Sequence, residues 1–234
     1  MSKSPCIAII DDGINPLFFH IWPLLSDVEI SYSLKVRKVK KHSPHVLNHA
    51  TVCAGIIKKY LPQANICSIK VLNENLKGSV AQTVKGIEWC IANNIKLINM
   101  SIGTTCSEDF NHISLIVEKA YNNGIIIVAA SNNNNKITYP ACLDKVIGVR
   151  CCPPKILGDG EFYYNSNDPK GIEITCNGSH CLKGPDDQTY ITGPSNSFAA
   201  PYVTTIVYSI IQDNSKASIE NINEILKQNA FSSL

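Results

Sequence analysis

The stretch ICSIKVLNENLKGSVAQTVKGIEWCIANNIKLINM, residues 66–100, holds a complete strand–helix–strand unit. Its two ends, Ile66 to Val71 and Leu97 to Met100, are short apolar runs typical of strands that are covered on both faces. Between them, apolar side chains recur at the spacing i, i+4, i+7 and i+11, which places them on one face of a helix: Val80, Val84, Ile87 and Ile91. A helix that joins two strands in this way makes them parallel, with a right-handed crossover.

The same pattern extends in both directions along the chain. Further short apolar runs cover Ile7 to Ile10, Ile125 to Ala129 and Val146 to Arg150, and a second helical spacing runs from Ile113 to Ala120. The sequence therefore predicts an α/β fold, with a doubly wound, mostly parallel sheet and helices on both faces. Because 234 residues is the length of one large domain, we expect residues 1–234 to form a single domain.

Composition and charge argue against several classes of protein. The 21 Lys and Arg against 19 Asp and Glu leave a net charge of +2, too small for the broad positive field of a nucleic-acid-binding protein. The basic run from Lys35 to Lys41 is interpreted as a solvated loop or strand edge. No apolar run approaches the ~20 residues that cross a bilayer, so we expect no membrane partner. The first residues lack the apolar segment of a secretory signal, which predicts a cytoplasmic protein.

The ten cysteines are too sparse for a disulfide-based scaffold. Those in apolar segments are typical of reduced, buried thiols: Cys6, Cys53, Cys67 and Cys90. Others stand among polar residues and leave zinc ligation and disulfide formation open: Cys151, Cys152, Cys176 and Cys181, with His180 beside the last. Because clean zinc sites usually pair their cysteines as C-x-x-C, we predict no bound metal and no cofactor.

Four polar side chains stand at positions suited to a binding site. Asp11 and Asn132 each follow an apolar run, and the carboxyl ends of parallel strands are where such sheets bind ligands. His49 opens a segment rich in small residues. Ser197 stands near the start of a helical segment, where free backbone N–H groups favour negative charge. Each residue alone fits a turn, a cap or a polar loop, but together they follow the order Asp, His, Asn, Ser.

The segments around these four residues resemble the subtilisin-like serine proteases, or subtilases, in which the order Asp, His, Ser is found. Residues 11–13 (DDG) are similar to the family's Asp-Ser/Thr-Gly motif, and residues 49–55 (HATVCAG) to His-Gly-Thr-x-x-Ala-Gly. Residues 197–201 (SFAAP) resemble the segment that carries the nucleophile. With the stretches 70–103 and 139–149, the resemblance covers about residues 6–212.

The resemblance implies a catalytic role for each of the four residues. His49 would take the proton of the Ser197 hydroxyl as that oxygen attacks a peptide carbonyl, and Asp11 would hold the imidazole in the required tautomer. The Asn132 side chain and the N–H of Ser197 would stabilise the negative oxygen of the tetrahedral intermediate. The implied activity is that of a serine endopeptidase that forms an acyl-enzyme.

The resemblance also implies where a peptide or protein substrate would lie. An extended peptide would pair with two edges: Leu76, Lys77 and Gly78 on one side, and Ser101, Ile102 and Gly103 on the other. Ala129, Ala130 and Thr138 would border the pocket for the residue before the cut. Because Thr138 stands where the family often has Gly, we expect a shallow pocket. These segments contain no acidic residue that would predict a preference for Lys or Arg at that position.

Three sites in the motifs depart from the family: Ala50 and Ser131 replace Gly, and Ser195-Asn196 replaces Gly-Thr. These side chains stand where glycine's freedom or a close approach is usual, and they leave two functions open. One is a protease of low activity, or a protease whose pocket is rebuilt for a single peptide. Such a protease would, for example, remove the leader from a ribosomally made peptide. The other is a pseudoprotease that binds peptides as a regulatory module.

The chain is short for the family it resembles. The stretch from Ala54 to Lys70 lacks the loop that binds structural calcium in secreted relatives, so we predict no obligatory calcium site there. We also expect no N-terminal arm, no inhibitory propeptide and fewer strands at the C-terminus. On this view the chain either folds without a propeptide or folds with the help of a partner chain that replaces it.

Overall fold

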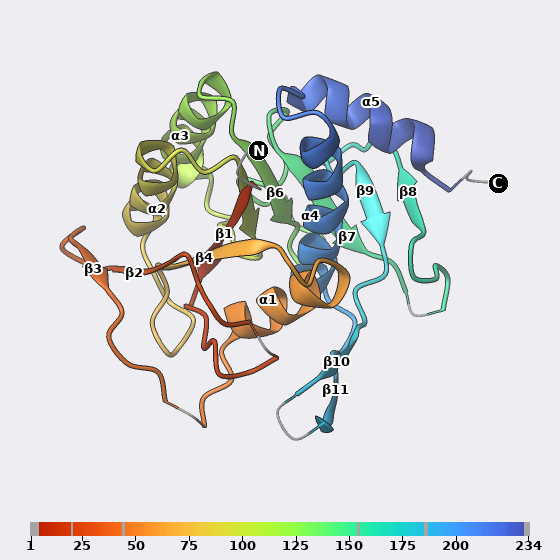
Figure 1. Ribbon diagram of the computed structural model, residues 1–234. Helices are drawn as coiled ribbons and strands as arrows, with labels where there is room; N and C mark the ends of the chain where they lie inside the picture. The colour runs from red at the N-terminus through yellow and green to blue at the C-terminus, as the bar shows by residue number, and fades with distance from the viewer. Residues whose placement is uncertain (1–4, 20, 44, 154, 185–186, 232–234) are drawn as a thin grey trace.

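The computed structural model describes residues 5–19, 21–43, 45–153, 155–184 and 187–231. Nine strands in these ranges form one sheet: β1 (Cys6–Asp11), β2 (Ser26–Ile30), β3 (Val36–Lys38), β4 (Asn65–Lys70), β5 (Leu97–Met100), β6 (Ile126–Ala130), β7 (Ile147–Cys151), β8 (Phe162–Tyr164) and β9 (Ile174–Cys176). Their order across the sheet is β3-β2-β4-β1-β5-β6-β7-β9-β8 (Figure 1). A separate antiparallel hairpin is formed by β10 (Cys181–Lys183) and β11 (Thr189–Ile191).

The sheet is parallel except at its two edges. From β2 to β9 in the spatial order, each strand runs parallel to its neighbours. The edge strands β3 and β8 are antiparallel to β2 and β9. Each apolar run that predicted a strand lies within one residue of a strand in the structure, and the predicted fold class is confirmed.

Helices cover both faces of the sheet (Figure 1). They are α1 (His49–Tyr60), α2 (Val80–Ala92), α3 (Phe110–Asn122), α4 (Asn196–Asp213) and α5 (Ile219–Asn229), with a 3-10 turn, η1, over Ser107–Asp109. Side chains of α1, α4 and α5 pack into one apolar core, and those of α2 and α3 pack into a second core on the opposite face. No helix in the described ranges is long and apolar enough to cross a bilayer.

Local sequence explains how the helices are placed. On α2, Gly86 allows close approach to the sheet, because a methyl group added there would meet Val71 and Ile69 at 3.2–3.3 Å. The helix begins at a capping box in which Ser79 and Gln82 exchange hydrogen bonds. Ser218 caps α5 in the same way with Asn221.

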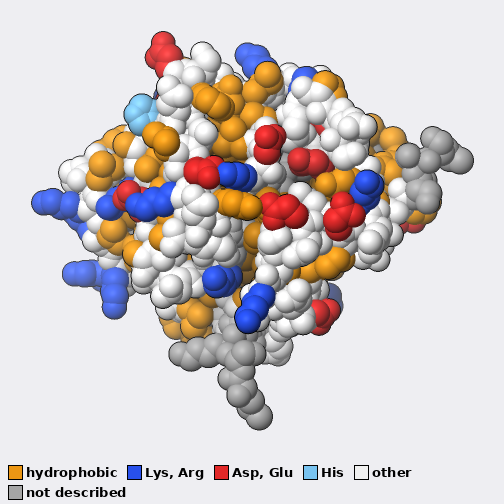
Figure 2. Space-filling view, turned by 90° about the horizontal axis from the view of Figure 1, so that it is seen from above, with side chains coloured by type: hydrophobic (Ala, Val, Ile, Leu, Met, Phe, Trp, Pro, Cys, Tyr) orange, Lys and Arg blue, Asp and Glu red, His pale blue; other side chains and the backbone are white. Residues whose placement is uncertain are grey.

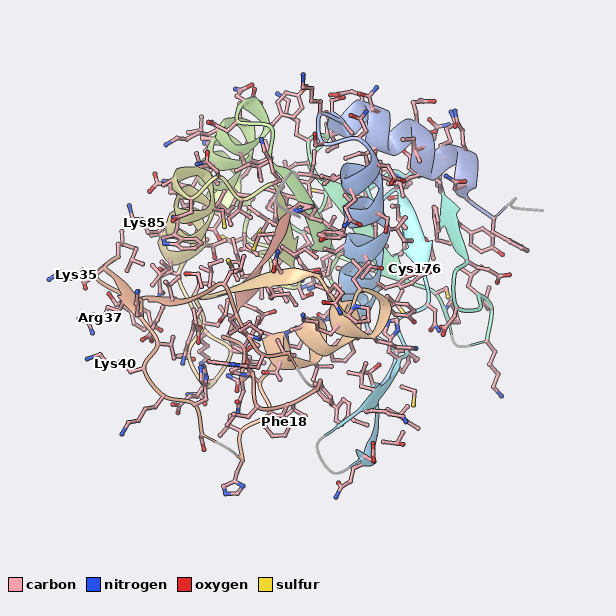
Figure 3. All side chains as sticks on the ribbon, in the orientation of Figure 1. Phe18, Lys35, Arg37, Lys40, Lys85 and Cys176 are labelled. Atoms are coloured by element: carbon pink, nitrogen blue, oxygen red, sulfur yellow. The ribbon has the colours of Figure 1, made fainter. Side chains whose placement is uncertain are left out.

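The basic run lies at the edge of the sheet, as predicted. All three residues of β3 are exposed, and Lys35, Arg37 and Lys40 point away from the body of the molecule (Figure 3). Figure 2, a view from above, also shows Lys and Arg side chains projecting at the periphery. An edge strand with charged side chains is protected from pairing with another sheet.

Candidate active site

The carboxyl end of β1 places Asp11 beneath the first residue of α1. Asp11 has no exposure to solvent, and its Oδ2 lies 2.9 Å from Nδ1 of His49. Its other oxygen accepts a hydrogen bond from the backbone N–H of Asp12 at 2.8 Å. Because an ionised carboxylate can only accept, this contact assigns the proton of the neutral imidazole to Nδ1 and leaves Nε2 as an acceptor.

Asp12 determines where α1 begins. The N-cap residue, Asn48, makes no side-chain cap bond. Instead, the Asp12 carboxylate accepts the N–H groups of His49 at 3.0 Å and Ala50 at 2.8 Å. The strand that carries Asp11 therefore also anchors the helix that carries His49. Sequence reasoning assigned no role to Asp12, although an acid beside Asp11 at a strand end was a visible signal.

Ser197 lies in the first turn of α4, and Pro201 explains how its backbone is held. Proline has no N–H, so it cannot bond the carbonyl four residues earlier, which belongs to Ser197. The Ser101 hydroxyl donates to that carbonyl at 2.7 Å, and the Cys53 thiol donates at 3.6 Å. The Ser197 hydroxyl donates in turn to the Ser101 carbonyl at 3.4 Å. The contacts of Ser101 and Cys53 beneath Ser197 were not foreseen from the sequence.

A cavity of about 650 Å³ brings most of the predicted residues together. Asp11, His49 and Ser197 line it together with every residue of the two predicted edges: Leu76, Lys77, Gly78, Ser101, Ile102 and Gly103. The three residues predicted to border the pocket before the cut are buried and are not part of this lining: Ala129, Ala130 and Thr138. Asn132 lines a neighbouring hollow of about 180 Å³.

Asn132 is held by its own loop. Its backbone N–H donates to Oγ1 of Thr138 at 3.0 Å, and its side-chain oxygen accepts the N–H of Asn134 at 2.7 Å. The carboxamide NH₂ group is the part of the side chain that can donate to a negative oxygen.

Two of the departures from the family motifs contact each other. The Asn196 NH₂ group donates to the Ser131 hydroxyl at 2.9 Å and to its carbonyl at 3.1 Å. The Asn196 side-chain oxygen accepts the N–H of Cys151 at 2.7 Å. These bonds tie the segment before Ser197 to the loop that carries Asn132. The third departure, Ala50, is buried within α1.

Comparison with known proteins supports one family. The model of the subtilase family matches residues 2–233. The chain belongs to the subtilase family.

Two curated relatives show the extent of the likeness. The minor extracellular protease Epr of Bacillus subtilis is 28% identical over 97% of this subtilase, and the match covers 35% of Epr. The thermostable alkaline protease of Halalkalibacterium halodurans is 29% identical over 70% of the chain, which covers 45% of that protein. The subtilase described here thus spans less than half the length of these relatives.

Solved structures show the same fold. The S41 psychrophilic protease superposes with a TM-score of 0.75 at 20% identity, covering 96% of this subtilase and 82% of that chain. A lanthipeptide protease superposes with a TM-score of 0.72 at 18% identity, covering 96% and 79%.

The charge of His49 depends on two opposing effects. Burial lowers the pKa of the His49 imidazole, but the hydrogen bond to Asp11 and the negative charges of Asp11 and Asp12 together raise it by more, so that the net pKa lies above its ordinary value. Burial and the charge of Asp11 raise the pKa of Asp12. The Phe198 ring covers the imidazole, with ring centroids 5.5 Å apart.

His180 supports the first turn of α4 in this subtilase. Its Nε2 lies 3.0 Å from the Phe198 carbonyl, and its Nδ1 lies 3.2 Å from the Tyr60 hydroxyl. Burial lowers the pKa of His180 to about 4, so the ring is neutral at pH 7. With both nitrogens engaged, His180 is not free to bind the zinc that its neighbouring cysteines had suggested as an alternative.

The cysteines of the subtilase are free thiols, and all ten lie in the described ranges. Cys53, Cys67 and Cys90 are buried as predicted, whereas Cys6 is half-buried. Cys176, labelled in Figure 3, contacts the Ala199 carbonyl of α4 at 3.7 Å.

Within the described ranges, one group of three potential metal ligands has its ligand atoms within 4.8 Å of one another: Asp11, His49 and Cys53. Metal ligation by Cys53 requires its thiolate. Burial, followed by the charge of Asp11, holds the pKa of that thiol well above its usual range. The donor set therefore disfavours a metal.

Proposed function

We propose that this subtilase is a serine endopeptidase in which Ser197 is the nucleophile, His49 the general base and Asp11 the group that orients His49. The observation that carries the proposal is the 2.9 Å contact between the buried Asp11 carboxylate and His49, at a cavity that Ser197 also lines. A carboxylate buried against an imidazole beside a serine is the arrangement that activates a hydroxyl.

The reaction begins when the Ser197 oxygen attacks the carbonyl carbon of a bound peptide. The Ser197 proton passes to Nε2 of His49, and the imidazolium is stabilised by Asp11. The carbonyl oxygen becomes negative and takes hydrogen bonds from the Ser197 N–H and the Asn132 NH₂ group. His49 then protonates the leaving amine, and water releases the acyl group from Ser197 by the same steps in reverse.

Thr138 does not line the cavity itself, but its close contact with Gly103, which does, supports a shallow pocket and a preference for a small residue before the cut. A methyl group added at Gly103 would come within 2.7 Å of the Thr138 methyl, so the two positions are already in close contact. The Thr138 side chain is 4% exposed and is held by hydrogen bonds to Asn132 and Lys136. Gly, Ala or Ser is therefore the expected residue, in a peptide that is processed at one or a few bonds, such as a leader peptide.

A fluorophosphonate probe, which labels activated serines, tests the proposal. The wild type should be labelled, whereas Ser197→Ala and His49→Ala should not. A synthetic peptide library analysed by mass spectrometry then reads the cleavage sites, with Ser197→Ala as the control. Equal labelling of wild type and Ser197→Ala would rule out this assignment.

A pseudoprotease that binds peptides is the second candidate. It is favoured by one observation: the N–H of Ser197, a donor needed for turnover, is bonded to the Ser195 hydroxyl at 3.2 Å. Stable binding of library peptides by wild type without cleavage would support this candidate.

A further inference from the structure

The first turn of α4 has no N–H group left for a substrate. Helix starts normally leave such donors free, and a subtilase needs the one on Ser197 for the negative oxygen of the intermediate. Here the N–H of Asn196 donates to the side-chain oxygen of Asn133 at 3.1 Å, and that of Phe198 to the Ser195 carbonyl at 3.1 Å. The N–H of Ser197 donates to the Ser195 hydroxyl at 3.2 Å.

Ser195 is the N-cap of α4 and has extended backbone angles. Its hydroxyl satisfies the second N–H of the helix, as N-cap serines do. At this helix, however, the capped donor is the one that the reaction requires. A residue without a side chain at position 195 would leave that N–H free.

We propose that Ser195 is a latch on the Ser197 N–H and that its hydroxyl must rotate away before the tetrahedral intermediate can form. This inference rests on the proposed peptidase function. In the attack, a bond forms between the Ser197 oxygen and the carbonyl carbon, the π-electron pair moves to the carbonyl oxygen, and the Ser197 proton moves to His49. The new negative oxygen then competes with the neutral Ser195 hydroxyl for the same N–H.

The surrounding contacts require the side chain, rather than the backbone, to move. Asn196 is 9% exposed and is bonded through its backbone and both ends of its side chain to Asn133, Ser131 and Cys151. This bracing holds the direction of the Ser197 N–H. Ser195 itself is half-buried and follows two exposed residues, Gly193 and Pro194, so we expect its hydroxyl to turn toward solvent.

The latch predicts that removing the hydroxyl accelerates the enzyme. Loss of an N-cap bond corresponds to about fivefold in an equilibrium constant. Ser195→Gly and Ser195→Ala should therefore raise kcat by about fivefold with little change in KM. A peptide aldehyde, whose carbonyl oxygen becomes the negative oxygen of a hemiacetal on Ser197, should bind tighter by a similar factor. If turnover is slow, the rate of fluorophosphonate labelling gives the same comparison.

Ser218→Ala is the matched control. Ser218 caps α5 with the same kind of bond, accepting the Asn221 N–H at 3.3 Å. Ser218→Ala should lower thermal stability, as Ser195→Ala does, without changing kcat or the affinity for the aldehyde. An unchanged kcat in both Ser195 variants would overturn the latch, and a lower kcat would instead make the hydroxyl a donor to the negative oxygen. The peptidase assignment is judged separately, by whether Ser197→Ala abolishes labelling.

Discussion

The imidazole of His49 contacts the carboxylate of Asp11 at 2.9 Å, and that carboxylate is fully shielded from solvent. Asp11→Asn keeps the size of the side chain but can offer an NH₂ group to Nδ1, which favours the wrong tautomer of His49. We expect kcat to fall by about 10⁴-fold, as in the serine protease for which that substitution was measured. Peptide cleavage measures this loss, and circular dichroism should show an intact fold. Retention of more than a tenth of the activity would contradict the role of Asp11.

The pKa of His49 predicts the acid limb of the pH profile. His49 must be neutral to accept the Ser197 proton, and its pKa lies above 6.5. Activity should therefore be present above that pKa and be lost as pH falls through it. The same shift stabilises the fold below pH 6.5, and this contribution is lost as pH rises through the pKa of the folded state. An acid limb of kcat/KM centred at or below pH 6.5 would show that Asp11 and Asp12 do not raise the pKa of His49 by more than burial lowers it.

Ser101→Ala should make the backbone of Ser197 less firmly held. The change removes the 2.7 Å bond to the Ser197 carbonyl that Pro201 leaves without a helical donor. The Cys53 thiol still donates to this carbonyl at 3.6 Å, so stability should fall by about 0.5–1.5 kcal/mol, the usual net contribution of one hydrogen bond, and kcat should fall with it. Chemical denaturation and peptide cleavage measure the two effects.

Pro201→Ala tests whether the missing N–H of Pro201 is the reason that Ser101→Ala lowers stability. This change restores an N–H that can bond the Ser197 carbonyl, so Ser101→Ala should cost less in the Pro201→Ala background than in wild type. If Ser101→Ala lowers the free energy of unfolding equally in wild type and in Pro201→Ala, the Ser101 hydroxyl does not stabilise the protein through the Ser197 carbonyl.

Thr138→Ser should broaden the residue accepted before the cut. The serine keeps the hydroxyl that bonds Asn132 and Lys136 but lacks the methyl that meets Gly103. We expect kcat/KM for Leu relative to Ala before the cut to rise by about tenfold, the usual effect of a small change in pocket volume. Thr138→Val, which keeps the bulk, serves as the control for size. An unchanged ranking of peptides in Thr138→Ser would place the pocket elsewhere.

His180 should make the protein sensitive to acid. Its pKa in the folded state is about 4 against 6.5 for a free imidazole, so its stabilising effect is complete above pH 6.5 and is lost as pH falls toward 4. The loss amounts to about 3 kcal/mol. His180→Gln can still donate to the Phe198 carbonyl but does not titrate. The melting temperature should therefore fall less steeply from pH 7 to pH 4 in His180→Gln than in wild type. Equal slopes of melting temperature against pH in the two proteins would contradict the prediction.

Local patterns were sufficient for the architecture because they report burial within one element. The apolar run of Leu97 to Met100 matches β5 residue for residue, and the helical spacing from Val80 onward matches α2. The capping box at Ser218 is equally local, since it joins residues three apart along the chain. A cap was one role left open for Ser197, but Ser195 is the N-cap of α4 and Ser197 follows in the first turn. The single domain and the cytoplasmic location remain predictions.

The sequence by itself determined the α/β sheet, the subtilase motifs and the candidate residues Asp11, His49, Asn132 and Ser197. Only the tertiary structure showed that Asp12 caps α1, that Ser101 holds the Ser197 carbonyl and that Thr138 meets Gly103. Hydrophobic periodicity constrains neighbours along the chain, whereas these contacts join segments brought together by strand order and helix packing. Ser195 stands between the two cases: its position was visible as a departure, but its bond to the N–H of Ser197 depends on how α4 begins.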